Sequence, residues 1–212
     1  MNAFCLGHPL RKRRPGIEVQ RRRLLDAARR LFAERGVEGI SIVDIVEASG
    51  VSRQTFYRCF ATRDALLSQV FDELEDHVTT RLTTALIGAS PNGDWLFGFV
   101  HEVLSDAALM GGLLVALHRE ELRPGSPMAL RRHRRLQRHV TFVERACESA
   151  GVVPPSPDVT RSLVLLLQVW GLEVATDPQV RSRVADLSQT LAGMFRQTLV
   201  AVGTLRDEPE RP

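Results

Sequence analysis

The chain has 212 residues, of which 44% are hydrophobic and 25% are charged, and its formal net charge is +3. This composition is typical of a globular protein with one large or two small packed domains. No apolar run approaches the roughly 20 residues that span a bilayer, and the apolar start before Arg11 is too short for a secretory signal. We therefore expect a cytoplasmic protein with no membrane partner.

Positive charge is concentrated near the N-terminus. Residues 1–63 contain 13 Arg and Lys against 6 Asp and Glu, a balance of +7, whereas residues 64–212 contain 15 against 19, a balance of −4. A basic first domain joined to a mildly acidic second one indicates that only one end is attracted to a polyanion such as DNA.

The cysteines are Cys5, Cys59 and Cys147, an odd number without the spacing of a zinc site or a disulfide framework. We expect reduced thiols, no metal site and no cofactor. Two roles stay open for Cys59, a small packed residue or a redox-sensitive thiol.

Residues 1–17 form a basic arm that we expect to be flexible. Its densest part is Arg11-Lys12-Arg13-Arg14, followed by Pro15. Two roles stay open for this arm, contact with a DNA backbone or minor groove and simple solubilisation.

The first predicted helix ends before Gly36, which stands where a C-capping glycine is expected. Its apolar residues recur at helical spacing and mark one buried face. They are Leu24, Leu25, Ala28, Leu31 and Phe32.

Two short helices joined by a tight turn are predicted next. Ser41 followed by Asp44 three residues later has the pattern of a capping box. Gly50 can adopt the positive φ that the turn demands, and Ser52 can cap the second helix. On that second helix Phe56 and Phe60 share one side, so the opposite side is free to contact another molecule.

Residues Val51 to Phe60, followed by Thr62 to Leu67, resemble the helix-turn-helix signature of the tetracycline-repressor (TetR) family. The resemblance extends over roughly residues 21–67, and Cys59 departs from it because His or an aromatic residue commonly stands there. It implies an all-α fold, in which residues 18–67 form a three-helix DNA-binding domain and residues 68–205 a helical domain for effector binding and dimerisation. Residues 206–212 form a polar tail.

Eight side chains are expected to contact DNA. Ser41, Ser52 and Tyr57 are expected to position the DNA backbone, and Arg63 to contact a phosphate. The residues after Ser52 have side chains that can bind the edges of bases. Gln54 and Arg58 are the best candidates because they point away from Phe56. The base-reading set is Arg53, Gln54, Thr55 and Arg58.

About six further helices are predicted after Thr62, separated by breaker clusters. Residues 90–94 read as a loop, and Ser-Pro or Asp-Pro pairs mark helix starts. These pairs are Ser126-Pro127, Ser156-Pro157 and Asp177-Pro178. No alternating strand pattern appears, which supports the all-α interpretation.

The middle of the second domain is where the resemblance places a small-molecule effector. Apolar residues between 95 and 117 either line a cavity there or belong to an ordinary core. The candidate pocket residues are Trp95, Phe99, His101, Met110, Leu114 and Leu117, with His118 and Glu102 as further polar candidates. The basic run Arg131 to His139 reads either as a solvated helix face or as a site for an anionic effector.

Two strongly apolar helices are predicted near the C-terminus, over residues 157–175 and about 180–202. The first is apolar almost all round, which is unusual for a surface helix. The resemblance implies that both pair with their copies in a second subunit, while a monomer core stays the alternative. The candidate interface residues are Leu166, Trp170, Leu187, Leu191 and Phe195.

Function follows from these parts. The sequence contains none of the common nucleophile, phosphate-loop, zinc-protease or dinucleotide motifs, so we do not expect an enzyme. We expect a homodimeric repressor that binds a palindromic double-stranded DNA operator and is released by a small-molecule effector of unknown identity. The alternatives are a regulator controlled by a partner protein or by its abundance, a nucleoid-type DNA-binding protein and, more distantly, a small all-α enzyme.

Overall fold

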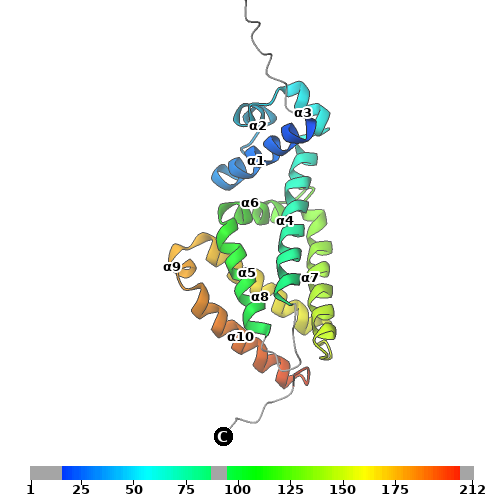
Figure 1. Cartoon of the computed structure of the whole chain (residues 1–212), viewed down its shortest axis with the longest axis vertical. Helices are drawn as coiled ribbons and strands as arrows, with labels where there is room; N and C mark the ends of the chain where they lie inside the picture. The colour runs from blue at the N-terminus through cyan, green and yellow to red at the C-terminus, as the bar shows by residue number, and fades with distance from the viewer. Residues whose placement is uncertain (1–15, 87–94, 206–212) are drawn as a thin grey trace, which may run out of the picture.

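The computed structural model describes residues 16–86 and 95–205, and all regular secondary structure in these ranges is helical (Figure 1). The all-α prediction is therefore confirmed. The basic run of the arm, the 90–94 loop and the polar tail lie outside the described residues. The helices are α1 (Ile17–Arg35), α2 (Ile42–Ser49), α3 (Arg53–Cys59), α4 (Arg63–Ala85), α5 (Trp95–Met110), α6 (Gly112–Leu122), α7 (Ala129–Ser149), α8 (Pro157–Thr176), α9 (Pro178–Arg181) and α10 (Val184–Ala201).

Helices α1, α2 and α3 form a small unit at one end of the molecule (Figure 1). The predicted capping box at the start of α2 is present, because the Ser41 hydroxyl accepts from the Asp44 amide while the Asp44 carboxylate accepts from the Ser41 amide. Gly50 ends α2 with a φ of 64°, which is the left-handed region that glycine adopts without strain. The Ser52 hydroxyl caps α3 by accepting from the Thr55 amide.

The core of this unit is built by the residues that the periodicity predicted. Phe32 from α1, Ile45 from α2 and Phe56 from α3 are fully buried together. The same core continues into α4 as far as Phe71, so the expected domain boundary at residues 67 and 68 falls inside a continuous helix. Because α4 belongs to both parts, it is a rigid connection between them.

The second domain is built around α5, which packs against α4 on one side and against α8 and α10 on others. Its core contains residues from these helices and from the end of α7. The predicted starts at Ser156-Pro157 and Asp177-Pro178 are confirmed as those of α8 and α9. The start at Ser126-Pro127 is wrong by two residues: α7 begins at Ala129, and the buried Ser126 hydroxyl accepts from the Met128 amide within the preceding turn.

Helix α8 is long and apolar enough to cross a membrane, and it is the one single helix of the described residues with that property. The buried central helix of a water-soluble domain has the same length and composition, and α8 packs against α5, α6 and α7. Yet only six of its 20 residues are buried within the chain. Several of its apolar side chains are therefore only partly covered, and Val169 is exposed.

Helix α6 packs across α1 and joins the two domains (Figure 1). At the point of closest approach, Gly112 faces the backbone of α1, where a Cβ atom would lie 2.4 Å from the Ala33 carbonyl oxygen. A backbone oxygen cannot rotate aside as a flexible side chain can. The start of α6 thus requires a residue without a Cβ.

We expect Gly112→Ala to lower the free energy of unfolding by about 1 to 3 kcal/mol, because α1 and α6 must separate to admit the methyl group. Gly98→Ala in α5 is the matched control, since its Cβ would meet no atom within 4 Å. That control should be neutral or stabilising by up to about 1 kcal/mol, as alanine favours a helix over glycine. Urea denaturation of both variants measures the difference, and equal stability would contradict the close approach.

Candidate nucleic-acid interface and buried cavity

The outward face of α3 carries the side chains that the sequence assigned to base reading. Arg53, Gln54 and Arg58 are exposed, and Tyr57 beside them is 47% exposed. The Arg53 guanidinium lies 5.9 Å from the centre of the Tyr57 ring. The inward face is held by Phe56, so rotation of α3 about its axis is opposed by the core. This gives one helix face with two guanidinium groups, an amide and a phenol.

Thr55 is not on that face. It is only 9% exposed, and its hydroxyl oxygen lies 3.0 Å from that of Ser52. The sequence placed Thr55 on the flank of α3 and assigned it to base edges. The structure corrects this, because the flank that Thr55 occupies is closed by its own N-cap.

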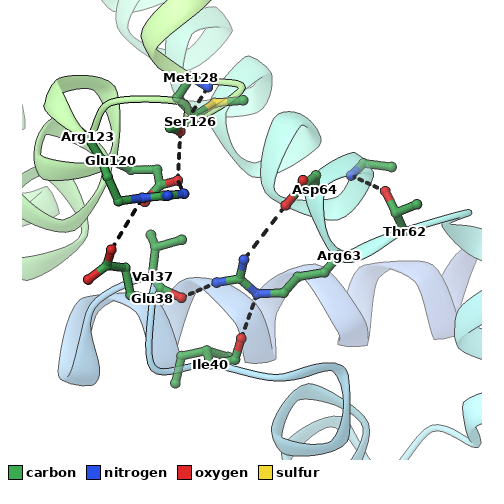
Figure 2. Close-up of polar contacts among 11 residues, drawn as sticks. Val37, Glu38, Ile40, Thr62, Arg63, Asp64, Glu120, Arg123, Ser126 and Met128 are labelled. Atoms are coloured by element: carbon green, nitrogen blue, oxygen red, sulfur yellow. Dashed lines mark hydrogen bonds and ion pairs between the residues drawn. The ribbon is translucent and has the colours of Figure 1, made fainter.

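Arg63 also differs from its expected position at a DNA phosphate (Figure 2). Its Nε donates to the Ile40 carbonyl at 2.6 Å, and a terminal nitrogen donates to the Val37 carbonyl. A further contact to Asp64 is 3.7 Å long. The guanidinium therefore ties the start of α4 to the loop between α1 and α2, and the structure makes Arg63 a positioning residue for the helix-turn-helix unit.

Ser41 and Ser52 use their hydroxyl groups as caps, and both residues are exposed at the helix starts. The hydrogen bonds from Ser41, and then from Arg35, hold the pKa of the Asp44 carboxyl well below its usual range. The capping box is therefore intact throughout the neutral pH range. A role of either serine at the DNA backbone stays a prediction.

Arg21 is a positioning residue that the sequence analysis did not single out. It donates to the Cys59 carbonyl at 2.7 Å, and its guanidinium carbon lies 4.4 Å from the centre of the Phe60 ring. It thereby fixes the C-terminal end of α3 to α1. Cys59 itself is half-buried, and burial raises the pKa of its thiol. A protonated, packed thiol favours the structural role over the redox role.

A cavity of about 140 Å³ lies in the second domain, between α4, α5, α6, α7 and α8. Four of the six predicted pocket residues line it, namely Phe99, Met110, Leu114 and Leu117. Most of the remaining lining is also apolar. His118, which the sequence marked as a further polar candidate, lines the cavity too, and burial followed by the nearby Arg135 lowers the pKa of its imidazole.

Trp95 and His101 do not line this cavity. Trp95 packs edge-on against Phe99 in the core. His101 lies on another face of α5, stacks on Phe97, and has its Nδ1 3.3 Å from the Ser188 hydroxyl of α10. Both predictions fail because an apolar helix with neighbours on several sides gives no sequence signal for which side borders the cavity.

Polar groups from α4, α6, α7 and α8 also line the cavity, and two of them, Arg135 and His139, belong to the basic run that the sequence left open as an effector site. Arg135 donates from two nitrogens to the two Glu121 carboxylate oxygens, each at 2.6 Å. His139 Nε2 lies 3.2 Å from a Glu75 oxygen, and its Nδ1 lies 3.3 Å from the Gln168 amide nitrogen. The basic run on α7 is thus divided, because two residues one turn apart point inward while most of the others are exposed.

The candidate dimer residues differ in how far they are buried within the chain. Leu191 and Phe195 are buried within the chain, against the core around α5, so they are not available to a second subunit. Leu166, Trp170 and Leu187 are half-buried. The apolar side chains that these helices expose most are Val169, at 55%, and Met194, at 49%.

Comparisons with known proteins agree with the geometry of α1 to α4. A family model of bacterial regulatory proteins, the tetR family, matches residues 24–70. The transcriptional regulator UidR of Escherichia coli K12 is 23% identical over 188 residues, covering 85% of this chain and 93% of UidR. The transcriptional repressor Rv3405c of Mycobacterium tuberculosis H37Rv is 40% identical over 81 residues, covering 38% of this chain and 41% of that protein.

Solved structures share the fold over most of the chain. A transcriptional regulator from Rhodococcus sp. Rha1 aligns with a TM-score of 0.70 and 21% identity, covering 84% of this chain and 96% of the other. Salmonella enterica GusR aligns with a TM-score of 0.63 and 23% identity, covering 86% and 94%.

The different surroundings of Arg58 and Arg63 lead to opposite expected effects of truncation. Arg58→Ala should leave the unfolding free energy nearly unchanged and reduce discrimination at one base position by about 1 to 3 kcal/mol. Arg63→Ala should instead destabilise the protein by about 1 to 3 kcal/mol, since two loop carbonyls lose a charged donor. Urea denaturation and DNA selection from a random pool separate the two, and an Arg63→Ala protein of native stability would refute its positioning role.

Proposed function

The chain is a DNA-binding transcriptional regulator of the TetR family, and we propose that it is a homodimeric repressor whose DNA affinity is lowered by a small molecule in the cavity. The operator is then a double-stranded palindrome, because two identical reading helices are related by a two-fold axis. In the bound state the two α3 helices lie about 34 Å apart, one turn of DNA, or a small multiple of that distance.

The exposed face of α3 supports the DNA-reading part of the proposal. Arg58 and Gln54 have side chains that suit guanine and adenine edges, while Tyr57 at the flank suits a phosphate. Arg21 and Arg63 contribute indirectly: Arg21 ties the C-terminal end of α3 to α1, and Arg63 ties the start of α4 to the loop between α1 and α2. A rigidly held face is what base reading requires.

Uncovered apolar surface supports the dimer. Helix α8 exposes Val169 and leaves Trp170 half-buried, and α10 exposes Met194. A second copy that covers these apolar side chains of α8 and α10 accounts for their exposure. The interface assigned from sequence is therefore shifted outward, from Leu191 and Phe195 to these residues.

The position of α6 is the observation that supports control of DNA affinity by a ligand in the cavity. Leu114, Leu117, His118 and Glu121 line the cavity from α6, while Leu117 also belongs to the core of the DNA-binding unit. The start of the same helix lies against Ala33 of α1. A ligand that displaces α6 must therefore change the packing of α1.

The turn after α6 adds a second connection to the DNA-binding unit (Figure 2). Glu120, at the end of α6, is buried and accepts from Arg123 at 3.0 Å and from the Ser126 hydroxyl at 2.7 Å. These hydrogen bonds, with Arg123 as the largest cause, lower the pKa of the Glu120 carboxyl. Arg123 also lies 3.4 Å from Glu38 in the loop after α1. The turn thus moves with α6 and touches the unit that holds α3.

Release requires that the ligand bind better to an arrangement of the two α3 helices that the operator does not fit. A differential of a few kcal/mol between the two arrangements is enough to shift the population. By reciprocity, operator DNA must weaken ligand binding by the same factor.

The effector is tested with operator fragments selected from genomic DNA, using fluorescence anisotropy during a metabolite screen. We expect a compound that raises the melting temperature and also releases the DNA, since it binds the folded cavity. Leu114→Trp fills the cavity and should abolish release, with DNA affinity nearly unchanged and a stability cost of about 1 to 3 kcal/mol.

Other outcomes of this screen support the alternatives. Compounds that stabilise the protein without releasing DNA would favour control by a partner protein or by abundance. DNA binding that depends on salt and not on sequence would favour a nucleoid-type protein.

The dimer is tested by Val169→Glu, which places a charge on the exposed apolar face of α8. We expect the variant to sediment as a monomer at micromolar concentration, because a buried unpaired carboxylate opposes association. Val153→Glu, an identical change at an exposed valine before α8, is the control and should leave the dimer intact. A dimer that tolerates Val169→Glu would place the interface elsewhere.

A further inference from the structure

We propose that the cavity takes a small apolar molecule that carries one protonated amine, and that the Asp106 carboxylate receives this amine. The inference rests on the proposed function, because it names the chemical class of the effector. It is argued from the hydrogen bonds and charges of the groups that line the cavity.

Asp106 is a buried acid without a hydrogen-bond partner among the described residues. It lies on α5, lines the cavity and is only 2% exposed. Its Oδ1 lies 3.1 Å from Arg81 Nε, but the N–H direction makes no hydrogen bond, and Oδ2 has no donor either. His77 Nε2 lies 3.7 Å from Oδ1, beyond hydrogen-bond distance. Burial of an ionised carboxylate that accepts no hydrogen bond costs free energy, and a donor that reaches the carboxylate reduces this cost.

The charges around Asp106 leave one negative charge unbalanced. Arg81 pairs with Glu102 as well as with Asp106, so one guanidinium is shared by two carboxylates. His77 is the other basic group nearby, and its side chain is 53% exposed. Burial raises the pKa of the Asp106 carboxyl, and this is the response of an acid that lacks a full counterion. A cation on the cavity side would supply it.

The other polar groups of the lining are hydrogen-bonded to one another, except His118, whose Nδ1 lies 3.8 Å from a Glu121 oxygen. Both Glu121 oxygens accept from Arg135, and Glu75 has His139 as a donor. If Gln168 donates to His139 Nδ1, then Nε2 carries the proton that Glu75 accepts. Arg135 is the one guanidinium among the lining residues, and Glu121 holds it in a bidentate pair. Burial lowers the pKa of the His118 imidazole, which favours its neutral form. The lining therefore offers no free cation to an anionic ligand, and Asp106 is the lining carboxylate that accepts no hydrogen bond.

The rest of the site fits an apolar body of limited size. Val103, Ala107 and Met110 line the cavity from the same helix as Asp106. Gly171 of α8 also lines the cavity and packs close to Ala107, because a Cβ at position 171 would lie 3.4 Å from the alanine methyl. A volume of about 140 Å³ is of the size that holds a single benzene ring.

The test uses four probes with one ring and different polar groups, namely benzylamine, benzyl alcohol, toluene and benzoate. Calorimetry on the full chain should show that benzylamine binds roughly tenfold or more tightly than benzyl alcohol or toluene, as a charge-assisted hydrogen bond predicts. Benzoate should not bind. This comparison needs no variant, so it stands even where a substitution harms folding.

Asp106→Asn provides the matched variant, because it keeps an acceptor oxygen of the same shape and removes the charge. We expect it to weaken benzylamine binding by roughly tenfold or more and to leave benzyl alcohol nearly unchanged. Asp76→Asn, an exposed acid of α4 outside the cavity lining, is the control and should change neither.

Several results would overturn the inference. These are equal binding of the alcohol and the amine, retention of benzylamine affinity by Asp106→Asn, preferential binding of benzoate, and absence of binding by all four probes. A different result would contradict the proposed function alone. In that case benzylamine binds in an Asp106-dependent manner, but no cavity ligand changes the affinity for the operator. Conversely, release of the operator by an amine-free metabolite, blocked by Leu114→Trp, would support effector gating and reject the amine.

Discussion

The packing of α6 against α1 is the constraint on which the rest of this structure depends. The two helices approach so closely at Gly112 that a Cβ would lie 2.4 Å from the Ala33 carbonyl oxygen. Close-packed backbones cannot deform continuously, so a displacement of α6 is passed on as a movement of α1. Leu117 strengthens the same connection, because one side chain belongs to the core of the DNA-binding unit and also borders the cavity.

Polar groups in the second domain fall into two classes with different consequences. Glu121 with Arg135, and Glu75 with His139, are buried pairs whose hydrogen bonds compensate for lost hydration. They hold α7 against α4 and α6. Asp106 is buried as well, but it has only an ion pair with Arg81, which Glu102 shares, and it accepts no hydrogen bond. In the proposed effector site, a ligand with a donor group at Asp106 would reduce the cost of burying this carboxylate.

Arginine residues around α3 show why charge alone is a poor guide to DNA contacts. Arg53 and Arg58 are exposed on the outward face of α3, whereas Arg21 and Arg63 donate to main-chain carbonyls. A planar guanidinium with five donors suits either task, and its surroundings decide which one it performs. The two internal arginines act on the structure, since Arg21 ties the end of α3 to α1 and Arg63 ties the start of α4 to the loop after α1.

The sequence by itself determined the features that depend on neighbours along the chain. The capping box of Ser41 and Asp44, the turn at Gly50 and the burial of Phe56 and Phe60 follow from local periodicity and from backbone preferences. The family resemblance and the all-α fold rest on these local signals. Leu114 and Leu117 were placed at the cavity because the family resemblance puts an effector in this apolar region, and both residues line it.

Only the tertiary structure decided which partner each side chain meets. Arg63 reaches Val37, 26 residues away, and His101 reaches Ser188, 87 residues away. Burial of Leu191 and Phe195 against α5, and the inward direction of Arg135 and His139, likewise depend on how helices cross. Helical periodicity states which residues share a face, but not what lies opposite that face. Packing between distant segments makes that choice, and it decides whether an arginine is solvated or bound to main-chain carbonyls, and whether a buried acid is hydrogen-bonded or not.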